Sequence, residues 1–160
     1  MTKKITVQTY LIYLFLLIIS LCILSSCSRE GGCIDPFSEN FNAYADFDDG
    51  SCIPMTAKFE GIYQVEEVCE FESYFYAMDI VATYDEPLEL VIRNFGDFGV
   101  DIFAYVDGFR LNIPFQSFYD GDQLVEISNG IGDLIGSELR ISYVYGENGF
   151  PIEVCEILAF

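Results

Sequence analysis

Apolar and polar residues alternate through residues 58–160, the last part of the chain. In the segment 109–113, Phe, Leu and Ile alternate with Arg and Asn, and the segment 139–143 has the same pattern. A period of two is typical of half-buried antiparallel strands. No stretch of this region has the three-to-four-residue spacing of an amphipathic helix. The pattern therefore predicts an all-β domain.

Turn-forming residues divide this region at short intervals. They lie at 85–87, 94–99, 107–108, 119–122, 129–136 and 146–151. The strands that we predict lie near residues 60–69, 73–84, 88–94, 100–106, 109–114, 123–129, 137–145 and 151–158. About eight strands with short connections favour an antiparallel up-and-down meander that closes into a barrel or half-barrel. An immunoglobulin-like sandwich is the alternative, but few connections are long enough for its crossings.

The start of the chain has a different pattern. Lys3 and Lys4 precede an almost wholly apolar run over residues 10–24, which ends in Leu24-Ser25-Ser26-Cys27. A charged start, an apolar run and small residues before a cleavage site are typical of a secretory signal helix, here over residues 1–26. An uncleaved membrane anchor is the alternative, since residues 5–24 could just span a bilayer.

The tetrapeptide that ends the apolar run resembles the lipobox of bacterial lipoproteins. In that family the cysteine sulfur receives a diacylglycerol, the chain is cut before the cysteine, and the new amino group is acylated. The resemblance implies lipidation of Cys27 and a lipidated tether over residues 27–32. It also implies a protein anchored through its lipid in the bacterial outer membrane, on the periplasmic or the cell-surface face.

The charge balance narrows the possible functions. The chain has 26 Asp+Glu against 7 Lys+Arg and a formal net charge of −19. Such a chain has no basic surface for phosphates, which excludes nucleic acid as a partner. The chain also has no His, which excludes Ser-His-Asp catalysis and His-based zinc sites. We interpret most of the acidic residues as a solvated surface.

Four cysteines remain once Cys22 leaves with the signal peptide and Cys27 carries lipid. An even number in an exported chain favours disulfides. Of the three pairings we favour Cys33–Cys52, which closes a short acidic segment, and Cys69–Cys155, which ties the first strand of the β domain to its last. A zinc site of four thiolates needs paired short spacings that this sequence lacks.

The segment 33–52 is rich in short oxygen-bearing side chains. Its candidate metal ligands are Asp35, Asn40, Asn42, Asp46, Asp48 and Asp49. Calcium takes six to eight oxygens from flexible loops, so this chemistry suits a Ca²⁺ site. The alternative is a disulfide-closed spacer whose Asp and Asn side chains cap their own backbone in Asx turns.

The same segment carries a recognisable pattern. Its ends read Cys33-Ile34-Asp35-Pro36 and Asp48-Asp49-Gly50-Ser51-Cys52, with Asn40 and Asn42 between them. This pattern resembles a short motif of exported bacterial proteins and is loosely similar to the calcium repeats of thrombospondin type 3. The resemblance covers about an eighth of the chain.

Three short patterns in the β domain point to a second family. Phe59-Glu60-Gly61-Ile62-Tyr63 opens the first predicted strand, and Ile113-Pro114-Phe115-Gln116 and Gly130-Ile131-Gly132 follow later. In these patterns the region 58–160 is similar to the small lipocalin-like domains of exported bacterial lipoproteins, with Tyr63 where lipocalins carry Trp. The resemblance implies a lipocalin-like barrel. An eight-strand barrel has room for at most one small ligand.

Aromatic residues are the candidates for ligand contact. The chain has 15 Phe and 11 Tyr but no Trp. Tyr74 and Tyr76 on one predicted strand, and Phe103 and Tyr105 on another, are the candidate binding residues. Aromatic rings on a strand face stack on a glycan, a peptide or a small apolar ligand. Simple filling of the core is the alternative.

Carboxylate pairs are the candidates for catalysis. Glu66 with Glu67, Glu70 with Glu72, and Asp120 with Asp122 are pairs that 26 acidic residues produce by chance. We therefore predict a non-enzymatic, membrane-anchored lipoprotein with a ligand-binding or envelope accessory role. A structural component of an outer-membrane complex and a carboxylate-dependent, glycan-active enzyme are the two alternatives.

Overall fold

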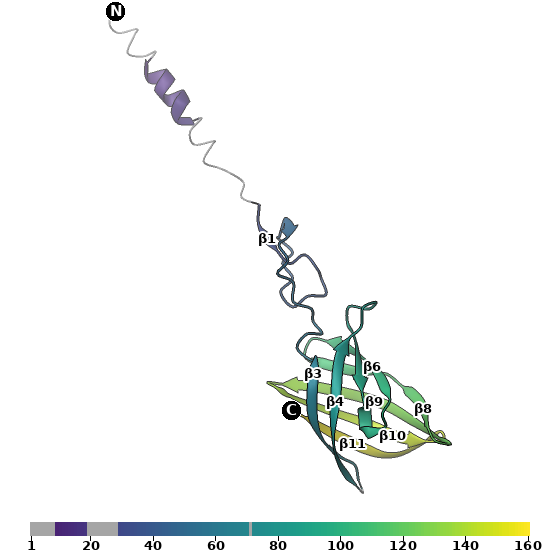
Figure 1. The fold of residues 1–160 in the computed structure, drawn as a ribbon. Coiled ribbons are helices and arrows are strands. Elements are labelled where there is room, and N and C mark those ends of the chain that lie inside the picture. Colours follow the sequence, from purple (N-terminus) through teal and green to yellow (C-terminus); the bar gives the residue numbers. More distant parts are fainter. Residues whose placement is uncertain (1–8, 19–28, 71) are drawn as a thin grey trace, which may run out of the picture.

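The computed structural model describes residues 9–18, 29–70 and 72–160 (Figure 1). Residues 9–18 are helical and fall within the predicted signal segment. None of the helices among the described residues combines the length and the apolar character needed to cross a bilayer. The predicted lipidation site, Cys27, lies outside the described residues.

Residues 61–159 form an antiparallel barrel, as the alternation predicts. Its eight strands are β3 (Gly61–Val68), β4 (Ser73–Ala82), β5 (Glu89–Arg93), β6 (Asp101–Asp107), β7 (Arg110–Ile113), β9 (Gln123–Ile135), β10 (Glu138–Glu147) and β11 (Phe150–Ala159). They pair in that order, and β11 pairs with β3 to close the ring. The all-β barrel is confirmed, and the alternative sandwich is not observed in the described part of the chain.

The stretch between β7 and β10 departs from the sequence prediction. An additional strand, β8 (Gln116–Asp120), pairs with the first part of β9, and β7 pairs with its last part. The predicted turn at 129–136 is therefore wrong, because β9 continues through it to Ile135. Gly130 serves close packing: a Cβ there would lie 2.6 Å from the Cβ of Ile113.

A β-bulge lies in the same stretch of β9. Ser142 on β10 is opposite Ile131, but Val144 is opposite Ser128, so Asn129 and Gly130 together face one residue of β10. Asn129 has a φ of 53°, a left-handed conformation that asparagine tolerates. Bulges bend a strand and re-aim neighbouring side chains. This one lies opposite Tyr143, which lines the site described below.

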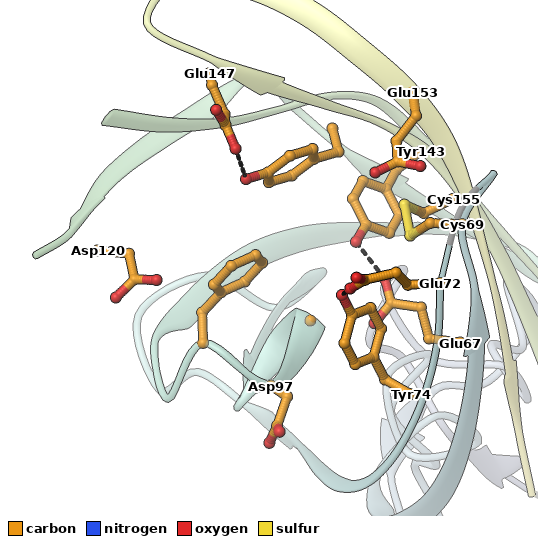
Figure 2. Close-up of a pocket in the computed structure, with 13 residues that line it drawn as sticks. Glu67, Cys69, Glu72, Tyr74, Asp97, Asp120, Tyr143, Glu147, Glu153 and Cys155 are labelled. Carbon is orange, nitrogen blue, oxygen red and sulfur yellow. Dashed lines mark hydrogen bonds between the residues drawn. A yellow bond between two sulfur atoms is a disulfide. The ribbon is translucent and has the colours of Figure 1, made fainter. Parts of the chain in front are cut away.

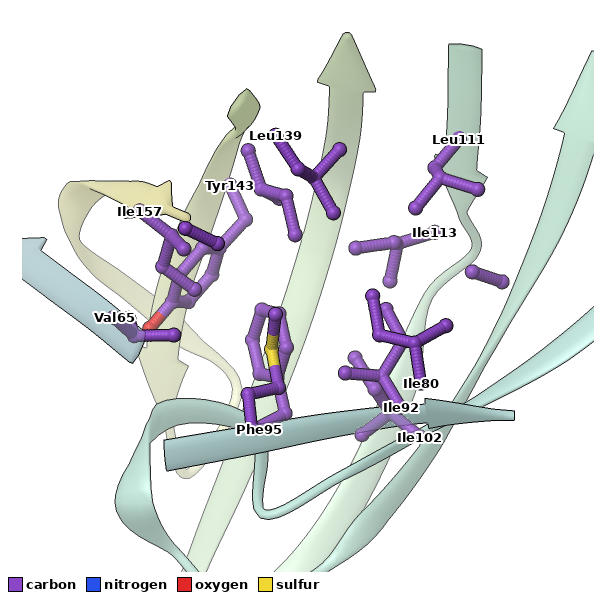
Figure 3. Close-up of a cluster of buried hydrophobic side chains, with 14 of the residues drawn as sticks. Val65, Ile80, Ile92, Phe95, Ile102, Leu111, Ile113, Leu139, Tyr143 and Ile157 are labelled. Atoms are coloured by element: carbon purple, nitrogen blue, oxygen red, sulfur yellow. The ribbon is translucent and has the colours of Figure 1, made fainter. Parts of the chain in front are cut away.

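The inward-facing side chains fill the barrel. Alternate positions are buried along at least part of each of the eight barrel strands, for example Ile102, Ala104 and Val106 on β6. Figure 3 shows Phe95, from the loop after β5, in the middle of the labelled core side chains, between Tyr143 and Ile102. Small eight-strand barrels are filled by their own side chains in this way. Any ligand must therefore bind at an end of the barrel or on its outside.

A small disulfide-closed module precedes the barrel. The Cys33–Cys52 bond closes it, and its short strands β1 (Gly31–Gly32) and β2 (Phe47–Asp48) pair in parallel. An ion pair of 2.5 Å between Glu39 and Lys58 joins the module to the start of the barrel. Both disulfides match the pairing expected from the sequence, because Cys69 and Cys155 are also bonded.

Candidate functional site at the barrel mouth

A cavity of about 430 Å³ opens at the end of the barrel where β3 ends (Figure 2). Its walls come from β3, β4, β8, β10, β11 and the short 3₁₀ turn η1 (Phe95–Asp97) with the residue after it. Four aromatic side chains line it: Tyr74, Phe98, Tyr143 and Tyr145. Six carboxylates also line it: Glu67, Glu72, Asp97, Asp120, Glu147 and Glu153. The cavity has a size typical of sites for small molecules.

The cavity lies in the mouth because β11 is only partly paired with β3. These two strands pair over Glu156–Ala159 of β11, and the Cys69–Cys155 disulfide sits directly beyond their last pair, Glu156 with Val68. The earlier residues of β11 pair only with β10. At this end the barrel therefore stays open between the β3–β4 hairpin and the β8–β11 strands.

The loop between β5 and β6 shapes the inner end of the cavity. Asn94 holds this loop, since its side-chain amide donates to the carbonyl of Ala77 at 2.9 Å and its Oδ1 accepts from the N–H of Gly99 at 3.0 Å. Gly96 adopts a φ of 63°, and a Cβ there would lie 2.6 Å from the ring of Phe98. This tight turn directs Phe95 into the core and leaves Phe98 in the cavity wall.

Aromatic rings form one wall of the cavity. Phe98 stacks on Tyr145 with a centroid distance of 6.1 Å and meets Phe118 edge-on at 5.3 Å. Phe95 supports Tyr143 from below, edge-on at 4.8 Å. These contacts hold the rings in place before any ligand arrives, which lowers the entropy lost on binding.

Glu67 is the polar group at the bottom of the cavity. It occupies an inward position of β3, following Tyr63 and Val65, and only 1% of its surface is exposed. One carboxylate oxygen, Oε1, accepts a hydrogen bond from the hydroxyl of Tyr143 (Figure 2). The other oxygen, Oε2, is buried without a hydrogen-bond partner among the described residues.

Burial controls the ionisation of this group and its neighbours. Desolvation raises the pKa of Glu67, the phenols of Tyr143 and Tyr76 oppose that rise, and the charges of Asp97 and Glu153 add to it. Burial also raises the pKa of Tyr143 and Tyr76, and the nearby charge of Glu67 raises both further. Glu67 is therefore a carboxyl that keeps its proton more readily than an exposed one.

The outer carboxylates of the cavity bond to tyrosines. Glu72 accepts a hydrogen bond from Tyr74 and Glu147 accepts one from Tyr145 (Figure 2). The bond to Glu72 raises the pKa of Tyr74 to about 12. These tyrosines therefore stay neutral and present both a ring and a hydroxyl to the cavity.

No Lys or Arg is among the described residues that line the cavity. The four cations of residues 58–160 form ion pairs elsewhere: Lys58 with Glu39, Arg93 with Asp79, Arg110 with Asp133 and Arg140 with Glu138. The negative charge of the cavity has no counter-ion in its walls.

The structure separates the four predicted binding residues. Tyr74 lines the cavity. Tyr76 lies beneath it, where its hydroxyl accepts a hydrogen bond of 3.1 Å from the N–H of Gly96. Phe103 and Tyr105 lie on the outside of β6, 45% and 44% exposed, and belong to no part of this site.

The sequence did not predict a role for Phe98, Tyr143 or Tyr145, or the buried position of Glu67. The predicted carboxylate pairs are also divided, since Glu67 and Asp120 line the cavity but Glu66 and Asp122 do not. A carboxylate in the apolar phase of β3 is the one signal that could have identified Glu67. Phe98 carries no comparable signal, because it stands in a loop.

One group of potential metal ligands is found among the described residues, and it lies in this cavity. It consists of Glu67, Cys69 and Cys155. Both sulfurs are bonded to each other in the disulfide, so neither is a thiolate that could bind a metal.

The candidate calcium ligands of the module serve its backbone. Asp35, Asn42, Asp48 and Asp49 each accept a hydrogen bond from an N–H two residues further along, as in Asx turns. Asn40 bonds to the backbone of Ser51 and Ile53, and Asp46 accepts from the N–H of Glu30. These bonds fit the spacer alternative, and calcium stays a prediction for this segment.

A second concave region lies on the outer surface of the barrel. It is an open groove of about 800 Å³ across β7, β9, β10, β11 and β3. Its charged residues include Arg110 and Asp133, which already pair with each other at 2.9 Å. Among the described residues that line the groove, none has an unpaired buried polar atom, so the mouth cavity is the stronger candidate.

Fold and site together define a closed antiparallel barrel with an acidic, ring-lined cavity at its mouth. Comparisons with protein-family models, with curated proteins and with solved structures gave no match.

Proposed function

We propose that this protein is a non-enzymatic lipoprotein of the bacterial outer membrane that binds a small ligand in the mouth of its barrel. The observation that carries the proposal is the cavity of about 430 Å³ lined by rings that are already packed in place. Because side chains fill the barrel interior, the mouth offers a partly enclosed site instead. Its size suits a ligand with one or two rings.

The direction of β3 supports this arrangement. The module joins the barrel next to Gly61, and Glu67 near the other end of the strand lines the cavity. Eight extended residues span about 25 Å. In a protein tethered through Cys27, the cavity would open at the end of the barrel opposite the one that the chain enters. The ligand would then approach from solvent.

Ligand-observed NMR with a set of aromatic fragments tests the binding site. The soluble chain from Ser28 onward is used, with Phe98→Ala to remove a ring of the cavity and Phe103→Ala as the control on the outer face. We expect fragments to bind the unchanged chain and the F103A variant, and to lose affinity for F98A. Fragments that bind equally to F98A but not to F103A would place the site on the outer face and refute the proposal.

Lipid anchoring needs a separate test in the full chain. We expect Cys27→Ala to abolish incorporation of labelled fatty acid, because the sulfur that would receive the lipid is removed. Cys22→Ala is the matched control, because that cysteine would leave with the signal peptide. Density-gradient fractions of the lipidated protein should sediment with the outer membrane. Fatty acid in the C27A variant would contradict the lipobox prediction.

A further inference from the structure

We infer that the ligand of the mouth cavity is an organic cation, an ammonium or guanidinium group on a ring-containing small molecule, and that Glu67 is its counter-ion. This inference rests on the proposed function, since it names the chemistry of the ligand for the same site. Three independent features of the cavity support it.

The first feature is the unpaired oxygen of Glu67. A buried carboxylate oxygen almost always has a donor, because losing its hydration without one is unfavourable. By geometry, Oε2 of Glu67 has no hydrogen-bond partner among the described residues; the phenol of Tyr76 lies near this carboxyl and opposes the rise that burial causes in its pKa, and Glu67 lines the cavity. A ligand N–H would give this carboxylate a further donor, and a charged N–H makes the stronger bond.

The second feature is the electrostatic field. Glu67 lies with five further carboxylates in the cavity wall, and the cations of the barrel are paired elsewhere. A cleft lined by one sign of charge raises the local concentration of the opposite ion. An anionic ligand would meet repulsion from every side.

The third feature is the ring wall. Tyr143, Tyr145 and Phe98 present aromatic surface beside these carboxylates. Aromatic faces attract cations, most strongly where water is excluded. Rings and carboxylates together are the chemistry that recognises ammonium and guanidinium groups.

A metal ion fits the same cavity poorly. The group of potential ligands that lies close enough together consists of Glu67 and two disulfide sulfurs. Glu72 and Glu147 already accept hydrogen bonds from the hydroxyls of Tyr74 and Tyr145. The negative charge is therefore spread around the walls, as suits an extended organic cation better than a point-like metal.

The environment of Glu67 gives the binding a pH signature. Burial raises the pKa of its carboxyl, and the groups that face it are Tyr143 from β10, Tyr76 from β4, Asp97 from the η1 turn and Glu153 from β11. A cation stabilises the ionised carboxylate, so binding releases a proton from Glu67. Affinity for an amine therefore rises with pH as the carboxyl ionises, while the amine itself stays charged.

Isothermal titration with three probes of nearly equal shape tests the inference. Phenethylamine is the cation, 2-phenylethanol the neutral probe and phenylacetate the anion. We expect phenethylamine to bind about tenfold to a hundredfold more tightly than 2-phenylethanol, and phenylacetate to bind least. The affinity of phenethylamine should rise as the pH is raised above the ordinary pKa of a glutamate, with proton release measured from two buffers of different ionisation enthalpy.

The matched variants are Glu67→Gln and Glu66→Gln. Glu66 directly precedes Glu67 on β3 and lines the groove on the outside of the barrel. We expect E67Q to lose the preference for phenethylamine and the pH dependence, and E66Q to keep both.

The possible failures are distinguishable. If 2-phenylethanol or phenylacetate binds as tightly as phenethylamine, and F98A weakens that binding, the cation inference is overturned and the proposed binding site stands. If phenethylamine binds best but E67Q binds it unchanged, Glu67 is not the counter-ion and the inference is overturned. If none of the three probes binds at millimolar concentration, the inference is overturned, and the fragment set decides the proposed function separately.

Discussion

The Cys69–Cys155 disulfide should account for a large part of the stability of the barrel. It joins two strands that are 86 residues apart in sequence, at the end of the seam where β3 and β11 pair. Replacing both residues by alanine, in a C69A/C155A variant, frees the two chain ends of the barrel from one another in the unfolded state. The strands themselves still pair over Glu156–Ala159 in the folded state.

The expected magnitude follows from the length of the closed loop. Loop-closure entropy predicts a stabilisation of about 4–5 kcal/mol for a separation of 86 residues and about 3 kcal/mol for the separation of 19 at Cys33–Cys52. For a domain of this size, a loss of that order lowers the melting temperature by on the order of 20 °C. The two disulfides also lie in different parts of the chain. Removing Cys69–Cys155 should therefore lower the stability of the barrel, whereas removing Cys33–Cys52 should affect the module.

Urea and thermal unfolding, followed by far-ultraviolet circular dichroism, measure the loss. We expect the C69A/C155A variant to unfold at much lower urea concentration and temperature than the unchanged protein. The control is C33A/C52A, which opens the module and should leave the barrel transition almost in place. The reasoning would be refuted if the two variants lost equal barrel stability, or if C69A/C155A melted within a few degrees of the unchanged protein.

Three further predictions concern packing, pH and metal. Gly130→Ala should destabilise the barrel by about 1–3 kcal/mol in urea unfolding, because its Cβ would meet the Cβ of Ile113 at 2.6 Å. Gly132→Ala should cost less, since its nearest contacts start at 3.2 Å, and equal losses would contradict this account. Folding raises the pKa of Glu67 above its ordinary 4.5, so the stability tied to this group is full below that pH and is lost as pH rises through the folded-state pKa. Relative to E67Q, the unchanged protein should therefore melt at progressively lower temperature as pH rises, and a constant difference would show that Glu67 is not perturbed. Removing calcium with a chelator should leave the protease resistance of the module unchanged, because its Asp and Asn side chains already bond to its backbone; a clear loss of resistance would favour a calcium site.

The strand pattern predicts most of the fold because burial in a barrel is a local property of each strand. Alternate residues of β6 point inward, and Ile102, Ala104 and Val106 could be assigned to the core from their spacing alone. The same reasoning fails at Gly130 and Gly132. Two glycines within three residues indicate a turn, but here they let the backbone of β9 approach side chains of β7 and β10 that a Cβ would strike.

The candidate site could be predicted only in part, because the number of aromatic residues in the sequence does not show where each ring points. Tyr74 and Phe103 look alike in sequence, as aromatic residues in alternating strands. One lines the cavity and the other lies outside the barrel, since the mouth opens at the ends of particular strands. That placement depends on register: β11 leaves β3 at Glu156, and the residues before it are free to border a cavity.

Glu67 is the one residue of the candidate site whose unusual position can be recognised in the sequence. An acidic residue in the inward phase of a strand, after Tyr63 and Val65, conflicts with the burial that the phase requires. A carboxylate kept in that position lowers the stability of the empty barrel, and replacing it by a residue of the surrounding apolar type would remove the penalty. Natural proteins break a local rule of this kind most often where function requires it. The burial of Glu67 therefore argues for a bound partner more strongly than the number of acidic residues around it, because surface carboxylates in a chain of this charge stay hydrated and this one does not.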